Sequence, residues 1–420
     1  MTYYYSAIIF ILTVAFISGS FSAFIIPKFR PVDILKGKLR LGNRNFFTKS
    51  LIIAQFALSI TLLLSTFVMG DQILFLRNKE MGFNKEGLLL IRTFENDPVE
   101  SKSIAALAQD RMRNNSSIDS ITACLSSFNR YLTSTAPHYV NGRRVNINFN
   151  NVHYDFLSTM GVAIIEGRDF SREFPNDTSA VIVNRKFIES LDIDDPIGKT
   201  IRINMTGNPE LRIIGIMDDY HFRSLETEIY PAMLCLNRKT AAFNYLLLKI
   251  STENVTDTIE YLENTWKDIQ PGKPFEYSFV DDDIEASYYS LRKWSEIVNI
   301  SSILALLITC IGIFCLTSFI MTRRIKEIGI RKVLGSSIPQ ILKLIGNEFI
   351  PFVVIANLIA IPLAWLIMSE WLNNFPYRIN IGIDIFVYSI ILSLTCTILT
   401  ISYHSIKSAL TNPVDSLRYE

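Results

Sequence analysis

The sequence predicts a membrane protein in which an α-helical transmembrane bundle of five spans carries a large extracytoplasmic α+β domain. Three observations support this mixed class. The 420 residues are 49% hydrophobic and only 19% charged, a composition between those of soluble proteins and of pure membrane bundles. Five stretches are long and apolar enough to span a bilayer. Residues 71–296, between two of these stretches, instead have the pattern of a soluble domain.

Each of the five predicted spans is an apolar run without Asp, Glu, Lys or Arg. A hydrocarbon core about 30 Å thick needs about 20 such residues in a helix, and a soluble core helix of this length would usually carry a polar face. A cleaved signal peptide is the alternative for the first run, but no basic residue precedes it, so we favour a retained span. The predicted spans are 4–26, 50–70, 297–322, 349–368 and 385–406.

The charges that flank these runs predict one orientation, because basic residues in short loops favour the cytoplasmic side. Residues 27–49 hold seven Lys and Arg residues against one acid, and a second basic cluster follows 297–322. The short link 369–384 holds one base and two acids. We therefore expect the N-terminus outside, the C-terminus in the cytoplasm and residues 71–296 outside.

Residues 71–296 read as an α+β domain. Short apolar runs bounded by turn residues predict strands, and two other segments have helical spacing. In the second of these, Ile259, Leu262 and Trp266 recur at i, i+3 and i+7. Thr256 is a candidate N-cap for that helix. The predicted strands are 87–93, 179–184, 211–217 and 244–250, and the predicted helices are 99–113 and 254–269.

A strand followed by a helix occurs near both ends of this domain, in "GLLLIRT…AALAQDRMR" and in "NYLLLKI…TIEYLENTW". The two halves are therefore expected to be alike, with the stretch from about residue 151 to residue 231 inserted between them. Within the insertion, "GRDFSREF", "IDDPIGKTIRI" and "MDDYHFRSLE" have the composition of tight turns between strands.

Two of these turns contain residues of catalytic or metal-binding type. Residues 198–200, Gly-Lys-Thr, resemble the end of a phosphate-binding loop, but that loop needs another Gly where Ile193 stands. Asp218, Asp219 and His221 are candidate metal ligands, yet no further His or Cys lies at a useful spacing. An acidic turn after a strand explains them equally well. We predict no catalytic residue, no cofactor site and no metal site in this chain.

Other polar residues of the exterior domain also have structural interpretations. The three acids at 281–283 are expected to form the solvated first turn of a helix that continues into the span 297–322, because acids are favourable at a helix N-terminus. Cys124 and Cys235 face an oxidising compartment, and their spacing leaves open whether they pair.

The cytoplasmic stretch 322–348, "TRRIKEIGIRKVLGSSIPQILKLIGNE", has more order than membrane orientation requires. Glu327 and Arg331 are i, i+4 partners, and Gly335 followed by two serines supplies a helix stop and a candidate cap. A stop-transfer cluster is the alternative, although scattered lysines would be enough for that role. The pattern predicts a short helix along the membrane surface.

At this stretch the chain resembles the permease subunits of FtsX/MacB-type ABC systems. In that family a form of "RRxxEIGIRKxLGSS" follows the second helix of the transmembrane unit and a form of "NPVDSLRYE" closes the unit; here these are residues 323–337 and 412–420. The phrases "GRDFS", "DDPIGKTIRI" and "IIGIMDDYHFRSLE" are also similar to the family's exterior domain. The resemblance covers nearly the whole chain.

The resemblance implies a domain organisation of one span, a large exterior domain with porter-like halves and an inserted lobe, three further spans and a short tail. Residues 1–49 would be the last span and cytoplasmic tail of a preceding unit. The remaining expected parts are the span 50–70, a MacB-like core domain at 71–296 and an FtsX-like three-span domain at 297–420, with a cytoplasmic coupling helix at 322–337.

A repeated tail motif motivates the assignment of the first residues to a preceding unit. The same Pro-Val-Asp follows the first and the last predicted span, and some members of the family carry two units in one chain. The chain is therefore expected to be the C-terminal part of a two-unit permease, with chance repetition as the alternative. The repeated residues are Pro31, Val32, Asp33, Pro413, Val414 and Asp415.

The resemblance also implies a function, that of the membrane subunit of an ABC export or extrusion system acting on peptides, lipoproteins or amphiphilic compounds. ATP is expected to be bound by a partner ATPase, so the chain itself is not an enzyme. Movement of that ATPase would pass through the coupling helix and the third span to the exterior domain, which is mechanotransmission. The alternative is a non-transporting relay that regulates a cell-wall hydrolase or a sensor kinase.

The expected partners are a cytoplasmic ABC ATPase, a second permease unit in a homodimer or heterodimer, and membrane lipid. A periplasmic adaptor and an outer-membrane channel are further candidates, and no nucleic-acid partner is expected. The expected location is the bacterial cytoplasmic (inner) membrane. The residues predicted to couple the chain to the ATPase are Arg323, Arg324, Glu327, Gly329, Arg331, Lys332 and Gly335.

Overall fold

The computed structural model describes residues 44–128, 134–204, 210–236, 238, 241–323, 327, 330–331 and 334–410, and in addition Tyr5, Ile9 and Phe16. The chain divides into two compact units. One consists of Ser59–Leu307 and Leu358–Ser393 and contains every strand that the structure describes. The other consists of Met1–Leu58, Ile308–Asn357 and Leu394–Glu420.

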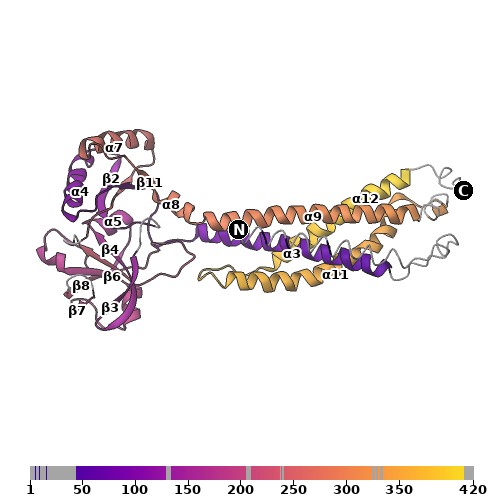
Figure 1. Ribbon diagram of the computed structural model, residues 1–420, viewed down its shortest axis with the longest axis horizontal. Helices are drawn as coiled ribbons and strands as arrows, with labels where there is room; N and C mark the ends of the chain where they lie inside the picture. Colours follow the sequence, from indigo (N-terminus) through magenta and orange to yellow (C-terminus); the bar gives the residue numbers. More distant parts are fainter. Residues whose placement is uncertain are drawn as a thin grey trace. The chain divides into compact units, whose positions relative to one another are not determined.

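Two β-α-β segments form one half of the exterior domain (Figure 1). Their strands lie in the order β11-β1-β10-β2, and every neighbouring pair is antiparallel. This is the ferredoxin-like arrangement, in which the two similar segments share one sheet. The elements are β1 (Leu88–Arg92), α4 (Pro98–Met112), β2 (Ile118–Cys124), β10 (Tyr245–Ile250), α7 (Val255–Ile269) and β11 (Tyr277–Phe279).

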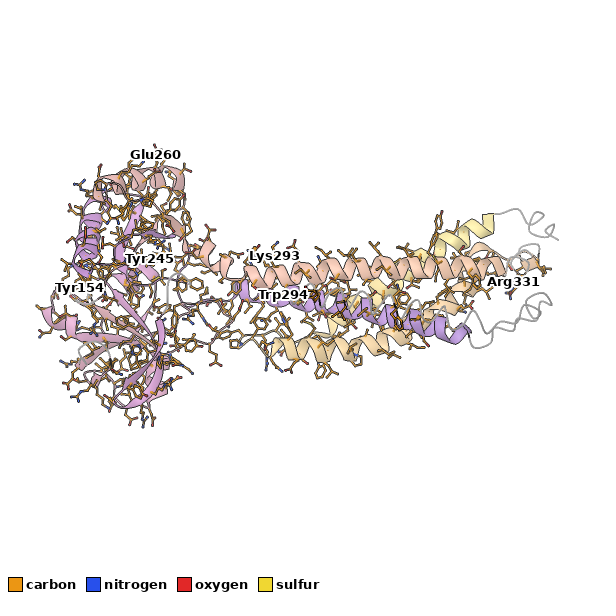
Figure 2. All side chains as sticks on the ribbon, in the orientation of Figure 1. Tyr154, Tyr245, Glu260, Lys293, Trp294 and Arg331 are labelled. Carbon is orange, nitrogen blue, oxygen red and sulfur yellow. The ribbon has the colours of Figure 1, made fainter. Side chains whose placement is uncertain are left out.

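Helices α4 and α7 contact each other and cover one face of this sheet. Leu262 and Trp266 of α7 are fully buried in the apolar cluster between helices and strands. Glu260, on the opposite side of α7, points into solvent (Figure 2). The helical spacing in the sequence therefore corresponds to the face that packs on the sheet, where each large apolar side chain contributes about 1.5–3 kcal/mol.

The two helices begin in different ways. Asp97 caps α4 by accepting two backbone N–H bonds at 2.8 and 3.0 Å, and Pro98 occupies the first helical position. The prediction that Thr256 caps α7 is wrong, because the N-cap residue is Asn254 and it makes no side-chain cap bond. The Thr258 hydroxyl instead donates to the carbonyl of Asn254 at 2.8 Å.

The remaining strands form an inserted lobe that continues the same sheet. From β2 the order runs through β4, β9, β6 and β8 to β5, with β3 paired to β4 and β7 to β8. The pairs β4–β9 and β6–β8 are parallel, whereas the other pairs are antiparallel. The elements are β3 (Ser134–Val140), β4 (Arg143–Val152), α5 (Phe156–Met160), β5 (Ile164–Gly167), the 3₁₀ helix η2 (Pro175–Ser179), β6 (Ala180–Asn184), α6 (Arg185–Leu191), β7 (Thr200–Arg202), β8 (Glu210–Met217) and β9 (Ala232–Leu236).

The insertion is longer than predicted, since it extends from the end of β2 to the start of β10 and includes the β3–β4 hairpin. In β4, Val145, Ile147 and Phe149 alternate with polar residues, which is the pattern of a half-buried strand that sequence reasoning missed. Asn141 and Gly142 connect the two strands with φ angles of 48° and 84°. Asn-Gly between two extended runs is the signature of a two-residue hairpin turn, and it is a second signal that locates this hairpin in the sequence.

Four helices within the described residues are long and apolar enough to cross a membrane. Of the predicted fifth span, 4–26, the structure describes only Tyr5, Ile9 and Phe16, so that span stays a prediction. The repeated tail motif, at 31–33 and 413–415, lies outside the described residues. The four helices are α3 (Arg44–Asn78), α9 (Tyr289–Arg323), α11 (Ile338–Leu372) and α12 (Ile383–Leu410).

The helix expected to run from the acids at 281–283 into the third span is in fact two helices. α8 (Val280–Ser287) ends before Tyr288, whose buried hydroxyl accepts a hydrogen bond from the Leu225 backbone N–H at 3.1 Å. α9 then begins at the next residue. The expectation of solvated acids is also wrong for Asp283, which is buried and accepts a hydrogen bond from the Ser278 hydroxyl at 2.9 Å.

Candidate functional site

The predicted coupling segment lies between α9 and α11, and the structure describes part of it. Arg323 is the last residue of α9. Glu327 and Arg331 have helical backbone, and Gly335 follows in a turn. The other predicted coupling residues lie outside the described residues; they are Arg324, Gly329 and Lys332.

Glu327 and Arg331 form an i, i+4 ion pair, with 2.9 Å between Arg331 Nη2 and Glu327 Oε1. Figure 2 labels Arg331. Both side chains are about half exposed, so the pair contributes only about 0.3–0.5 kcal/mol to the helix. Such a pair stabilises little, but it fixes where a positive and a negative group stand on the helix surface.

The chain leaves this helix by a Schellman-type turn. Gly335 has a φ of 93°, and the Ser336 N–H donates to the carbonyl of Arg331 at 2.9 Å, which is the 6→1 bond of that motif. The next helix, α11, starts with half of a capping box, because the Gln340 side chain accepts from the Ser337 N–H at 2.9 Å. The stop at Gly335 agrees with the sequence, whereas Gln340 is a capping partner that sequence reasoning missed.

Two apolar side chains beside the ion pair were also missed. Ile330 and Leu334 are four residues apart, so they share one helix face, and they are 52% and 80% exposed. An exposed apolar pair flanked by charges is typical of a helix that docks into a groove on a partner. Their i, i+4 spacing is the signal in the sequence.

In the exterior domain, the candidate metal ligands Asp218 and Asp219 bond neighbouring groups of the protein. Asp218 pairs with Arg185 at 3.7 Å. Asp219 accepts a hydrogen bond from the Lys186 N–H at 3.1 Å, and its burial raises the pKa of this carboxyl. Among the residues that the structure describes, no three His, Cys, Asp or Glu side chains converge as a metal site.

The Gly-Lys-Thr turn at residues 198–200 belongs to the sheet. The Gly198 N–H donates to the carbonyl of Ile213 at 2.7 Å, and the Ile213 N–H donates to the carbonyl of Lys199 at 2.9 Å. Thr200 then begins β7. These backbone groups are paired with β8, so the turn offers no cradle for a phosphate.

Cys124 and Cys235 are both free and buried. Cys124 belongs to the apolar cluster at the base of the domain, and Cys235 belongs to the cluster inside the inserted lobe. Burial raises the pKa of each thiol to about 12. The two thiols are therefore unreactive core residues.

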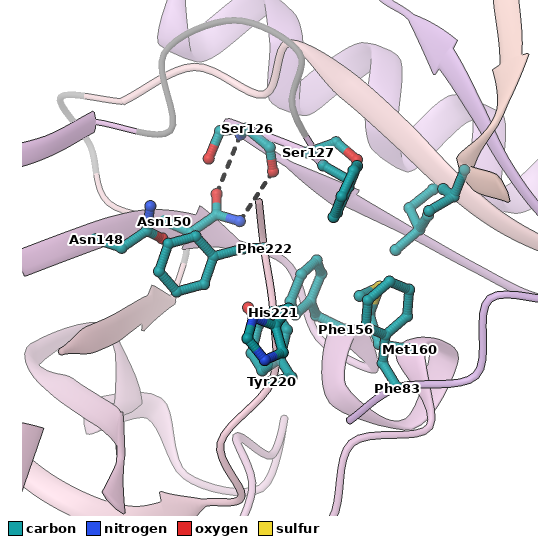
Figure 3. A pocket seen from close by; sticks show the side chains of 13 residues that line it. Phe83, Ser126, Ser127, Asn148, Asn150, Phe156, Met160, Tyr220, His221 and Phe222 are labelled. Atoms are coloured by element: carbon teal, nitrogen blue, oxygen red, sulfur yellow. Dashed lines mark hydrogen bonds between the residues drawn. The ribbon is translucent and has the colours of Figure 1, made fainter. Parts of the chain in front are cut away.

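A small cavity lies inside the exterior domain, between residues of the ferredoxin-like half and of the inserted lobe (Figure 3). The Asn150 amide closes one side by accepting from the Ser126 N–H at 3.1 Å and donating to the Ser126 carbonyl at 2.9 Å. Asn148 lines the cavity with a buried Nδ2 that has no hydrogen-bond partner among the residues that the structure describes. The volume of about 20 Å³ suits one water molecule and is too small for a substrate.

Polar contacts tie the membrane helices to the base of the exterior domain. Arg77 of α3 bonds Glu285 of α8 at 2.6 Å, and Arg292 of α9 lies 3.6 Å from the same carboxylate. The bond between Tyr288 and Leu225 joins the α8–α9 junction to the segment after β8. Three helices are thus connected at this base through neighbouring residues.

Two family models match this chain. The model described as MacB-like periplasmic core domain matches residues 51–264, which is more than half of the chain. The model described as FtsX-like permease C-terminal matches residues 299–413. No curated protein matches the chain.

Solved structures of related domains also match, each over about half of this chain. The periplasmic region of MacB from Actinobacillus actinomycetemcomitans is 15% identical, with 48% of this chain and 92% of that chain covered and a TM-score of 0.35. The extracellular domain of YknZ, a noncanonic ABC-type transporter from Gram-positive bacteria, is 13% identical, with 46% and 97% covered and a TM-score of 0.33. A domain of a putative permease from Porphyromonas gingivalis is 13% identical, with 47% and 91% covered and a TM-score of 0.33.

The family of this chain is assigned from the two family models alone, because the TM-scores of the solved structures are low. The two models cover most of the exterior domain and the helices that follow it, in the order found in one permease unit. Family membership in turn implies association with an ABC ATPase. The chain belongs to the FtsX/MacB-type permeases and is the multi-pass inner-membrane subunit of an ABC-type system.

Proposed function

We propose that this permease transmits ATP-driven movement from a separate cytoplasmic ATPase to its exterior domain, and that residues 322–337 are where the ATPase docks. The observation that carries the proposal is the exposed pair Ile330 and Leu334 beside the Glu327–Arg331 ion pair. Together they form a short helix surface with an apolar centre and fixed charges, which is suited to a groove on a protein partner.

Helix α9 supports the proposal because it runs without interruption from Tyr289 to Arg323. Its 35 residues span about 52 Å at 1.5 Å per residue. Its first turns carry Arg292, which reaches Glu285 of α8. A displacement of the cytoplasmic end of α9 would therefore be delivered to the base of the exterior domain.

The same proposal assigns orientation and cargo. The N-terminus and the exterior domain lie outside the cytoplasm, and the coupling segment and C-terminus lie inside, as the flanking charges favour. The cargo is a peptide, lipoprotein or amphiphilic compound handled from the outer side of the membrane. Two permease units would work with the ATPase, and an adaptor with an outer-membrane channel would receive the cargo.

A mild-detergent pull-down of the tagged full-length chain from its native host tests the docking site. Leu334→Glu and Gly329→Trp should insert into the membrane at the wild-type level but retain less than about one tenth of the ATPase, since about 1.4 kcal/mol is a tenfold change in affinity. Val99→Glu is the matched control, because Val99 is 73% exposed on helix α4 of the exterior domain.

Wild-type ATPase recovery with both coupling variants would disprove the docking site. The other proteins retained by the wild-type chain test the cargo assignment. An outer-membrane channel or lipoprotein would support export, whereas a sensor kinase or a cell-wall hydrolase would contradict it and show a signalling relay.

A further inference from the structure

Gln72 of α3 is fully buried, and both ends of its amide are used. Its Nε2 donates to the carbonyl of Tyr377 at 2.8 Å, and its Oε1 accepts from the N–H of Ile379 at 3.0 Å. Both partners belong to the link between α11 and α12, and Tyr377 is 305 residues from Gln72 along the chain. Because one side chain bonds the same backbone segment at two points, it restrains both the distance and the orientation of that segment relative to α3.

Tyr377 extends this contact from the link to the base of the exterior domain. Its ring centroid lies 5.1 Å from that of His221, with an interplanar angle of 79°. The amino group of Lys79, just beyond α3, lies 4.8 Å from the same tyrosine ring. The backbone N–H of His221 donates to the carbonyl of Met81 at 2.8 Å. The link, the end of α3 and the segment after β8 therefore meet around one aromatic ring.

Apolar packing holds the same link. Phe375 is 6% exposed and belongs to the apolar cluster at the base of the exterior domain. Its ring centroid lies 4.8 Å from that of Trp371 in α11. The link is therefore fixed by two hydrogen bonds, by ring contacts and by a buried aromatic side chain, all within one compact unit.

We propose that the link at residues 373–382 is a coupling element, and that Gln72 and Tyr377 are its positioning residues. The chain itself joins the exterior domain only to α3 and α9. Through Gln72 and Tyr377 the adjoining ends of α11 and α12 also move with the domain, so that all four helices act on it together. This role rests on the proposed transmission, whereas the attachment of the link to the domain does not involve the ATPase.

Hydrogen exchange of the full-length chain in lipid nanodiscs, without ATPase, tests the attachment. Gln72→Leu removes both hydrogen bonds at nearly constant volume, and exchange at the Ile379 amide is expected to be about tenfold faster. Tyr377→Ala should accelerate exchange both in the link and in residues 218–222. Tyr377→Phe is the matched control, because it keeps the ring on His221 and Lys79 and should exchange as the wild type does. Wild-type exchange in Gln72→Leu and Tyr377→Ala would overturn the proposal.

The same variants in complex with the co-purified ATPase test the coupling role. Addition of ATP to the wild-type complex should change exchange in the exterior domain, and Gln72→Leu and Tyr377→Ala should reduce that change about threefold or more while binding as much ATPase as the wild type. An undiminished ATP response in variants whose link exchanges faster would show that the link only stabilises the fold, which overturns the coupling role. No ATP response in the wild type would contradict the proposed transmission itself, and the exchange result without ATPase would still decide the attachment.

Discussion

The buried carboxylate of Asp177 accepts two hydrogen bonds of 2.7 Å from the guanidinium of Arg168. The Ser171 N–H donates a third bond to it at 3.0 Å, and the ring of Phe174 lies 3.9 Å from the guanidinium carbon of Arg168. The turn "GRDFSREF" and the 3₁₀ helix η2 are therefore organised around one ion pair. This pair is the most fully bonded charged contact that we describe in the inserted lobe.

Asp177→Asn is expected to lower the free energy of unfolding of the exterior domain by about 1.5–3 kcal/mol, because it weakens charge-assisted bonds to a buried group. Thermal or denaturant unfolding of the full-length chain, followed by tryptophan fluorescence, measures this. Glu210→Gln is the matched control, since Glu210 pairs with Arg202 on the exposed surface and should cost less than about 0.5 kcal/mol. Equal effects of the two substitutions would contradict the role of the buried pair.

The same ion pair predicts a pH dependence. Burial alone would raise the pKa of Asp177, but the hydrogen bonds from Arg168 and Ser171 and the charge of Arg168 lower the pKa below its ordinary value of 3.8. The folded pKa is thus below the unfolded value of about 3.9. The stabilisation is complete above the unfolded pKa and is lost as the pH falls through the folded pKa. The difference between wild type and Asp177→Asn should therefore shrink below about pH 4.

His221 gives a second pH dependence, at higher pH. Its burial, and then the charge of Lys79, lower the pKa of the imidazole to about 4, compared with about 6.5 in the unfolded chain. The unfolded chain binds the proton more readily, so the contribution of His221 is complete above about pH 6.5 and is lost as the pH falls toward 4. His221→Phe should reduce the slope of melting temperature against pH in this window, and an unchanged slope would contradict the prediction.

Asn151 connects the inserted lobe to the segment before β10. Its Oδ1 accepts from the Arg238 N–H at 2.8 Å, and its Nδ2 donates to the carbonyl of Ala241 at 3.2 Å. Asn151→Ala should cost about 1–3 kcal/mol of unfolding free energy, because two half-buried backbone groups lose these bonds. Asn148→Ala is the control, since Asn148 is equally part of β4 but its Nδ2 has no partner in the described part of the chain; a larger loss at Asn148 than at Asn151 would argue against this account.

The helix that contains Glu327 and Arg331 ends at Gly335, which has a left-handed backbone conformation. Its φ of 93° costs an L-residue about 1–2 kcal/mol, least for Asn and most for a β-branched residue. A Cβ at this position would meet no described residue within 4 Å, so the backbone conformation is what the substitution tests. Gly335→Val should therefore reduce recovery of the ATPase in a pull-down more than Gly335→Asn does. Equal recovery would show that the turn at Gly335 does not position the docking surface.

Strong local patterns in the sequence predict much of this fold. The apolar run at 244–250 becomes β10, and the helical spacing at 254–269 becomes α7. The β3–β4 hairpin is harder to predict because Pro137 interrupts the sequence of β3. The apolar face of the hairpin, which includes Val140, Ile147 and Phe149, is buried in the core of the inserted lobe. The break between α8 and α9 depends on the burial of Tyr288 in a core that the local sequence does not show.

The candidate site also contains residues that the sequence predicts and residues that it does not. The ion pair of Glu327 and Arg331 and the helix end at Gly335 can be predicted, because both depend only on residues close together in the sequence. The role of Gln72 cannot be predicted from the sequence, since nothing local distinguishes it from Gln55 in the same helix and its partners lie about three hundred residues later. Only the folded chain shows that this amide hydrogen-bonds the backbone of the α11–α12 link.

The length of the helices has a mechanical consequence. α3, α9 and α11 each contain 35 residues, or about 52 Å of helix, whereas the hydrocarbon core is about 30 Å thick. To lie wholly inside that core, such a helix would have to tilt by about 55°, beyond the usual range of about 0–40°. At a usual tilt, part of each helix therefore lies outside the hydrocarbon core. If such a helix pivots at its midpoint, a rotation of about 10° displaces its tip by about 4–5 Å, close to the rise of one helical turn.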